Sequence, residues 1–197
     1  MQMKNIREAH LRNRTERGTT LIELMIAMVV LAIGLGAITV LLAGAMTSNN
    51  KSSRDMTATL LAQMVMEQIS AQHVYSNGTI NVTDCAGNPW TIATATGPAG
   101  TGNGATLKSD GTIDFTQAYS ALLGSNYAMQ YVDCSASGGS QTTYEVRWNV
   151  MSVSNNTSSR LITTAARVLP TSDTMLGGPV FAFPVNLRGI GAPSAGQ

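Results

Sequence analysis

Glu23 is the residue whose position most clearly suggests chemistry, because it is an ionisable side chain at the start of a long apolar run. The run extends over Leu24–Met46, and the next charged residue is Lys51. Carrying a charge to the centre of a bilayer costs about 2.5–3.5 kcal/mol, so an ionisable residue at this boundary indicates a function. Gly18 lies five positions earlier and ends a basic segment. Taken alone, Glu23 could simply reach the lipid headgroups, and Gly18 could be an ordinary loop residue.

The other reactive side chains form no familiar catalytic or ligand pattern. His10 and His73 are far apart in the sequence, and the two cysteines add no metal-ligand spacing to them. The segment GPAGTGNG, residues 97–104, is too short for a dinucleotide fingerprint and is expected to be a flexible loop. There is no GxSxG or HExxH sequence, and a net charge of +1 does not indicate a nucleic-acid partner. The sequence therefore predicts no metal, no cofactor and no enzymatic activity.

The apolar run predicts a transmembrane helix over about residues 24–46. Residues 24–50 carry no charge, and as a helix they extend about 40 Å, more than the roughly 30 Å of a hydrocarbon core. Five Lys or Arg residues precede the run, whereas Lys51 and Arg54 follow it closely. This bias predicts a cytoplasmic N-terminus and an exported remainder. An ordinary signal peptide fits less well, because its apolar core is usually about 7–15 residues long.

Cys85 and Cys134 are the two cysteines of the chain, and both follow the membrane segment. In an exported domain, two cysteines favour one disulfide. Closing a loop of about 50 residues would stabilise the domain by about 4 kcal/mol on the chain-entropy model. The alternative is two free thiols that are buried separately. Geometry decides between them, because Cα atoms more than about 7 Å apart cannot be bridged without backbone movement.

A second helical pattern follows the membrane segment. Its apolar residues recur with helical spacing in two adjacent rows, Met56–Leu60–Met64 and Leu61–Val65–Ile69. This pattern predicts an amphipathic helix, and hence one continuous helix from about Leu21 to about Gln72. We expect the methionine-rich row to belong to the core of the domain.

Residues 73–197 predict a β-rich head. In TYEVRWNVMSV the apolar residues alternate with Glu145, Arg147 and Asn149, as in a half-buried antiparallel strand. The polar turn SNNTSS and the segment RLITTAARVLP then predict a β-hairpin that ends at Pro170. Weaker strand candidates are residues 79–82, 90–95 and 127–134. The tail from Arg188 is expected to be disordered.

The junction ERGTTLIELMIAMVVLAIGL resembles the cleavage and methylation motif of type IV prepilins. In that family a membrane-embedded aspartic peptidase cuts after the glycine and methylates the new N-terminal residue. The resemblance implies that Gly18 ends a leader and that Thr19 is the mature, N-methylated N-terminus. It also assigns Glu23 to assembly, with the α-amine of Thr19 as its partner in the same or a neighbouring subunit. The family usually has Phe where Thr19 stands.

The chain is most similar to V-type minor pilins, the type IV pilus modification proteins, and the similarity extends to I-type pseudopilins of type II secretion. It is strong over residues 14–70 and modest over 143–170. The implied fold is α+β and pilin-like, a long N-terminal helix packed on a small antiparallel sheet. Its parts are a cleaved leader (1–18), the helix (19–72) and the exported head with a flexible tail (73–197). Major pilins often carry Pro near Val40, so its absence favours a minor subunit or a pseudopilin.

The sequence thus predicts a structural subunit that assembles into, or primes, a pilus filament. The implied partners are the prepilin peptidase and other pilins or minor pilins, which contact the N-terminal helix. The implied location is the bacterial inner membrane in a single pass, and then the pilus or cell surface. Two alternatives remain: an I-type pseudopilin, and a membrane-tethered exported binding domain that never leaves the bilayer.

Overall fold

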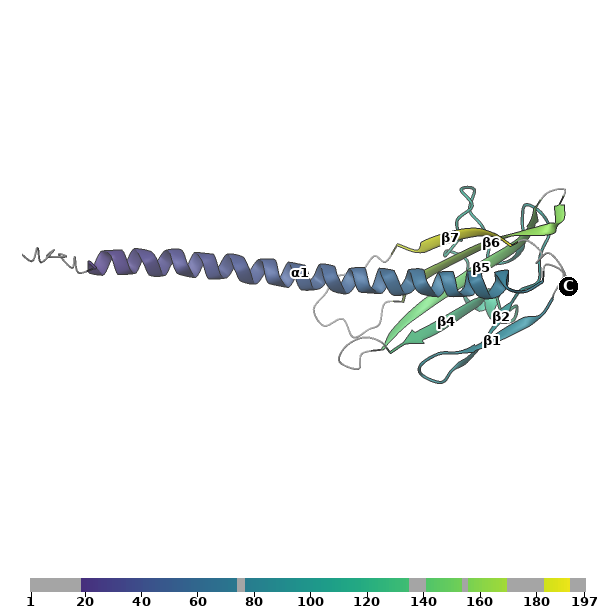
Figure 1. Cartoon of the computed structure of the whole chain (residues 1–197), viewed down its shortest axis with the longest axis horizontal. Coiled ribbons are helices and arrows are strands. Elements are labelled where there is room, and N and C mark those ends of the chain that lie inside the picture. Colours follow the sequence, from purple (N-terminus) through teal and green to yellow (C-terminus); the bar gives the residue numbers. More distant parts are fainter. Residues whose placement is uncertain (1–18, 74–76, 135–140, 154–155, 170–182, 192–197) are drawn as a thin grey trace, which may run out of the picture. The chain divides into compact units, whose positions relative to one another are not determined.

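The computed structural model describes residues 19–73, 77–134, 141–153, 156–169 and 183–191 (Figure 1). The chain divides into two compact units, Met1–Ser48 and Asn49–Gln197. The leader segment 1–18, with Gly18, lies outside the described residues.

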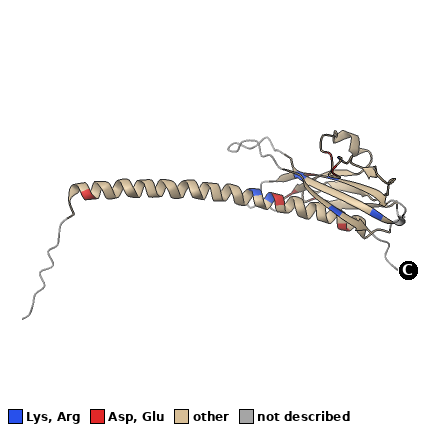
Figure 2. Ribbon diagram, turned by 90° about the horizontal axis from the view of Figure 1, so that it is seen from above, with Lys and Arg blue, Asp and Glu red and all other residues tan. Residues whose placement is uncertain are grey.

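Helix α1 is continuous over Leu21–Ser70, as the sequence predicted. Every residue from Leu21 to Asn50 is exposed. By length and composition, α1 is the one helix among the described residues that could cross a membrane. Its lack of charge between Glu23 and Lys51 can be followed in Figure 2.

The head contains a five-stranded antiparallel sheet. Its long central hairpin consists of β5 (Thr142–Val153) and β6 (Asn156–Val168), which confirms the predicted hairpin. Strand β7 (Val185–Gly191) pairs with β6. Along the other side of β5 lie β4 (Ala128–Asp133) and the two-residue β3 (Asn103–Gly104).

A separate two-stranded hairpin completes the strands. It consists of β1 (Thr79–Thr83) and β2 (Pro89–Ala93). Strands β1, β2 and β4 confirm the three weaker candidates, with β2 two residues shorter at its end than predicted. The short helix α2 spans Ser120–Leu123 and precedes β4.

The main core lies between the last turns of α1 and one face of the sheet. Leu61, Val65 and Ile69 are buried there with Trp148 and its neighbours on β5 and β6. The expectation that the methionine-rich row forms the core is wrong for its first two members, because Met56 is 67% exposed and Leu60 is 56% exposed. The helix packs on the sheet through the face that carries Leu61 because small residues lie there. Ala58 and Ala62 are also buried, and their short side chains let the helix backbone approach the sheet.

The opposite face of β5 is also buried, contrary to the expectation of a half-buried strand. Glu145, Arg147 and Asn149 are each 1% exposed. The reason is a second, smaller core, in which residues from the chain between β3 and β4 pack on this face. Its members are Ala105, Ile113, Leu122, Ala128 and Ala165.

The glycine-rich segment 97–104 is attached to the sheet, so the prediction of a flexible loop is wrong. The Gly97 N–H donates to Val150 O at 2.9 Å, and Gly97 O accepts from Ser152 N–H at 2.9 Å. Gly104 has a φ of +107°, and a Cβ there would lie 2.4 Å from Trp148 O. Glycine is therefore required for this close approach rather than for mobility.

The predicted disordered tail is also corrected in part. Arg188 lies within β7, and pairing with β6 continues to Gly191 opposite Arg160. A seven-residue strand with an internal glycine has only a weak local preference for β structure. Its pairing with β6 is what makes it a strand. Residues 192–197 lie outside the described residues.

Candidate functional site

The start of α1 places Thr19 and Glu23 at the junction that the sequence singled out. Thr19 is exposed and precedes the helix. The Glu23 N–H donates to Thr20 O at 3.0 Å and lies 3.4 Å from Thr20 Oγ1, so Thr20 caps the helix. Glu23 lies in the first turn, where the unpaired N–H groups of a helix favour a negative charge.

Thr20 is a helix-capping residue at the junction that the sequence interpretation missed, although a signal for it was present. Thr20 and Glu23 have the spacing of a T-x-x-E capping box immediately before an apolar run. The cap makes the helix begin at Leu21, which leaves Thr19 outside it. The carboxylate therefore lies within one turn of the residue that the resemblance makes the mature N-terminus.

The apolar surface that follows Glu23 is far larger than a soluble monomer normally exposes. The side chains along Leu24–Met46 are exposed on all sides of the helix. Exposed apolar surfaces of this size indicate a membrane or a protein interface. The first half of α1 can therefore be placed in a bilayer or packed among other apolar helices.

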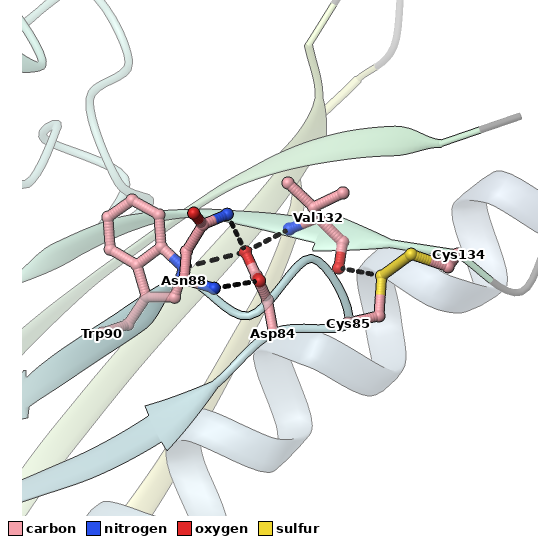
Figure 3. Close-up of a disulfide and its surroundings, with 6 residues drawn as sticks. All are labelled: Asp84, Cys85, Asn88, Trp90, Val132 and Cys134. Carbon is pink, nitrogen blue, oxygen red and sulfur yellow. Dashed lines mark hydrogen bonds between the residues drawn. A yellow bond between two sulfur atoms is a disulfide. The ribbon is translucent and has the colours of Figure 1, made fainter.

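The structure brings the two cysteines together. Cys85 and Cys134 form a disulfide, with their Cα atoms 5.9 Å apart. Both residues are exposed. The bond links the turn between β1 and β2 to the end of β4, and so joins the small hairpin covalently to the five-stranded sheet (Figure 3).

Asp84 is the centre of a hydrogen-bond cluster beside this disulfide (Figure 3). Its carboxylate accepts from Asn88 N–H at 2.8 Å, Asn88 Nδ2 at 2.9 Å, Trp90 Nε1 at 3.1 Å and Val132 N–H at 3.3 Å. Burial raises the pKa of Asp84, but these four bonds stabilise the ionised form and lower the pKa to about 2 overall. The cluster therefore holds a carboxylate that is ionised near neutral pH.

A buried ion cluster occupies the second face of the sheet. Glu145 accepts from Arg147 with one oxygen and from Arg167 with the other, and both guanidinium groups lie over the ring of Phe115. Arg147 also donates to the carbonyl oxygens of Asp114 and Gln117, at 3.2 and 2.8 Å. Both oxygens of Glu145 are thus occupied, and the cluster holds the segment between β3 and β4 on the sheet.

Arg160 joins the end of α1 to β6. Its side chain is fully buried and donates to the carbonyl oxygens of Ile69, in the last turn of the helix, and of Gln72, just after the helix ends. Burial lowers the pKa of the guanidinium. A cation at a helix C-terminus binds carbonyl groups that have no partner within the helix. Sequence reasoning missed this role, because Arg160 and Ile69 are 91 positions apart.

Neither the disulfide region nor the ion cluster resembles a catalytic centre. Among the residues that the structure describes, no three His, Cys, Asp or Glu side chains come together as a metal site. The features that point to a function are the junction at Thr19–Glu23 and the exposed apolar helix that follows it.

Comparison with known proteins supports this junction as the informative part of the chain. Residues 13–39 match the family model described as the prokaryotic N-terminal methylation motif. The matched segment includes Gly18, Thr19 and Glu23 and continues into the apolar part of α1. Neither curated proteins nor solved structures yield a match.

The motif and the fold agree on the class of protein. A long apolar N-terminal helix packed on antiparallel sheets is consistent with an α+β pilin-like fold. The motif supports a type IV pilin-like or pseudopilin protein that is processed by a prepilin peptidase. Motif and helix together fit anchoring in a membrane followed by assembly with other pilins.

Proposed function

We propose that this chain is a minor type IV pilin-like subunit that a prepilin peptidase cuts between Gly18 and Thr19 and methylates at Thr19. The observation that carries the proposal is the continuity of the methylation motif with one 50-residue helix, which is uncharged from Leu24 to Asn50. Cleavage at this position removes the basic leader and leaves the membrane segment in place. The subunit can then be extracted from the inner membrane into a filament.

The orientation follows from charge. The basic leader remains in the cytoplasm, and the head is exported. Between the membrane and the filament, the apolar half of α1 exchanges lipid for the helices of other pilins or minor pilins. The mature α-amine of Thr19 and the carboxylate of Glu23 form the ion pair that aligns neighbouring subunits. Such a pair is worth more at the edge of an apolar environment than in water.

Major pilins often have Pro where Val40 stands in α1, and this departure favours a minor subunit or a pseudopilin over a major pilin. An I-type pseudopilin of a type II secretion system is the second candidate, because the methylation motif supports pilins and pseudopilins alike. Deletion of the gene separates the two: loss of surface pili with normal secretion supports the pilus, and the reverse supports the secretion system. A membrane-tethered binding domain requires that the leader is retained.

Mass spectrometry of the N-terminus of protein purified from membranes tests the proposal. We expect a chain that begins with methylated Thr19, and we expect Gly18→Val to retain the leader because the peptidase needs a small residue before the cut. Gly34→Ala is the control, since a Cβ at Gly34 meets no atom within 4 Å. An intact N-terminus in the wild type, or normal processing of Gly18→Val, would contradict the assignment.

A second variant tests the role of Glu23 separately from cleavage. Glu23→Val should be inserted and processed normally but be depleted from the filament fraction, because insertion does not need the charge and alignment does. Glu67→Val makes the same change in the exposed part of α1 that belongs to the head, and it should assemble normally. Wild-type levels of Glu23→Val in filaments would exclude this role.

A further inference from the structure

Residues 84 and 85 contact both backbone groups of one residue of β4. Asp84 accepts the Val132 N–H at 3.3 Å, and Cys85 Sγ lies 3.0 Å from Val132 O (Figure 3). Val132 is paired with Thr143 of β5 in the ladder, and both backbone groups of a residue point to the same edge of its strand. The turn between β1 and β2 is therefore attached to the edge of β4 that faces away from β5.

Part of this attachment is independent of the sulfur atoms. Three of the four hydrogen bonds to Asp84 come from Asn88 and Trp90 and hold the carboxylate within the β1–β2 hairpin, and the fourth, from the Val132 N–H, joins it to β4. A disulfide sulfur carries no hydrogen, so the contact between Cys85 Sγ and Val132 O becomes a hydrogen bond only in the dithiol form, where the thiol donates. Reduction would break the covalent link and leave the other contacts of the turn in place.

We propose that Asp84 is the positioning residue for formation of the Cys85–Cys134 disulfide. By holding the turn on Val132, Asp84 brings the two thiols together before oxidation, and the disulfide then closes a contact that already exists. The proposal is independent of the assembly function proposed above, since it concerns the head alone.

The oxidation is an exchange with a small or protein disulfide. The thiolate of one cysteine attacks the oxidant, which forms a mixed disulfide and releases one oxidant thiolate. The second cysteine thiolate then attacks the protein sulfur of the mixed disulfide, and the second oxidant thiolate leaves. Two electrons and two protons pass to the oxidant, which becomes a dithiol or two thiols. Proximity governs the second step, because it is intramolecular.

A purely electrostatic role for Asp84 makes a different prediction. Each cysteine follows an aspartate, Asp84 before Cys85 and Asp133 before Cys134. A neighbouring carboxylate disfavours a thiolate, so a charge effect would slow exchange and would be shared by both aspartates. Positioning belongs to Asp84, since its carboxylate accepts the Val132 N–H that holds the turn on β4.

The test measures the effective concentration of one thiol for the other. The full chain in detergent micelles is equilibrated with mixtures of glutathione and glutathione disulfide, and the oxidised fraction is determined after alkylation. Asp84→Asn should lower the effective concentration at least about tenfold, because it removes hydrogen bonds to a charged group. Asp133→Asn is the matched control and should stay within about twofold of the wild type. An unchanged value for Asp84→Asn, or an equal loss in both variants, would overturn the proposal.

Amide hydrogen exchange at Val132 reports the contact directly, since this N–H points to Asp84 rather than to β5. In the dithiol wild type it should be protected, and in dithiol Asp84→Asn it should exchange at least about tenfold faster. The amides shared by β5 and β6 should not change. Rapid exchange at Val132 in the dithiol wild type would refute docking before oxidation.

If Asp84→Asn fails to fold, Trp90→Phe provides a milder variant. It removes one of the four donors and keeps an aromatic ring. The effective concentration of one thiol for the other in Trp90→Phe should be lower than in the wild type, and higher than in a chain whose Asp84 carboxylate has lost all four bonds. A value equal to that of the wild type, together with an unprotected Val132 amide, would reject the positioning role.

Discussion

Arg160 shows how one buried side chain stabilises the junction between a helix and a sheet. It lies on β6 and receives its hydrogen-bond partners from the last turn of α1 and from Thr94 O, which is 3.5 Å from Nη1. Burying a guanidinium costs free energy, and its bonds to the carbonyl groups at the end of the helix offset that cost, although Ile69 O also accepts from Gln72 N–H at 3.0 Å. The net effect depends on how many of those carbonyl groups lose their partner when the side chain is removed.

Arg160→Met should lower the free energy of unfolding of the head by about 1.5–3 kcal/mol, because the carbonyl groups of Ile69 and Gln72 lose a charged donor. Urea unfolding followed by tryptophan fluorescence, from Trp90 and the buried Trp148, measures the change. Arg188→Met is the control: Arg188 is exposed on β7, and its replacement should cost less than about 0.5 kcal/mol. If Arg160→Met unfolds with the same free energy as the wild type or a higher one, the cost of burying the cation is at least as large as the stabilisation from its hydrogen bonds.

Asp84 gives the head a pH dependence on the acid side. Its folded pKa of about 2 is below the ordinary value of 3.8, so its hydrogen bonds contribute full stability above about pH 4, and this contribution is lost as the pH falls towards 2. The difference in unfolding free energy between wild type and Asp84→Asn should therefore shrink between pH 5 and pH 2.5. Urea unfolding at these two pH values measures it. A difference that grows on acidification would contradict the assigned pKa direction.

At the scale of elements, α1 has two apolar rows and the sheet covers one of them. Leu60 is 56% exposed, whereas its neighbour Leu61 is 7% exposed. A Leu→Ala change in a packed core removes buried apolar surface and leaves a cavity. The same change at an exposed leucine has neither effect. These adjacent residues therefore form a matched pair for testing which row packs on the head.

Leu61→Ala should destabilise the head by about 2–5 kcal/mol, and Leu60→Ala by less than about 0.5 kcal/mol. Both variants are measured in the full chain by urea unfolding. Both make the same Leu→Ala change in the same helix, so the change in helix propensity is equal for the two. Equal losses would mean that the core uses both rows. A larger loss for Leu60→Ala would reverse the assignment.

At the scale of the whole molecule, the chain separates into a unit that ends at Ser48 and a unit that begins at Asn49. The second unit contains the packed part of α1, both cores and the disulfide. The apolar half of α1 contributes no buried residue to these cores, since residues 21–50 are exposed. The head should then fold without the membrane segment.

A fragment of residues 49–197, exported to an oxidising compartment, should be soluble without detergent and unfold in one cooperative transition. Circular dichroism and urea unfolding test this, and peptide mapping without reductant should recover the peptide that links Cys85 to Cys134. A matched fragment carrying Leu61→Ala should unfold at lower urea. Aggregation of the parent fragment would show that residues before Asn49 are needed for folding.

Local patterns in the sequence by themselves determined several parts of this protein. The uncharged run, the helical spacing after it and the alternation in β5 are properties of neighbouring residues, and they sufficed for α1 and for the β5–β6 hairpin. The junction motif is likewise contiguous, so Gly18, Thr19 and Glu23 could be proposed as candidates without a structure. The Thr20 cap was equally readable from its spacing to Glu23.

The tertiary structure decided what depends on distant partners. Two apolar rows of α1 have nearly the same periodicity, and only the sheet selects the row of Leu61, because Ala58 and Ala62 allow close packing there. The sequence pattern predicted that the polar face of β5 is exposed to solvent. In the structure the chain between β3 and β4 packs over Glu145 and Arg147, and the alternation within β5 carries no information about that distant segment. Burial of a charge requires partners from elsewhere in the fold, and no local pattern contains them.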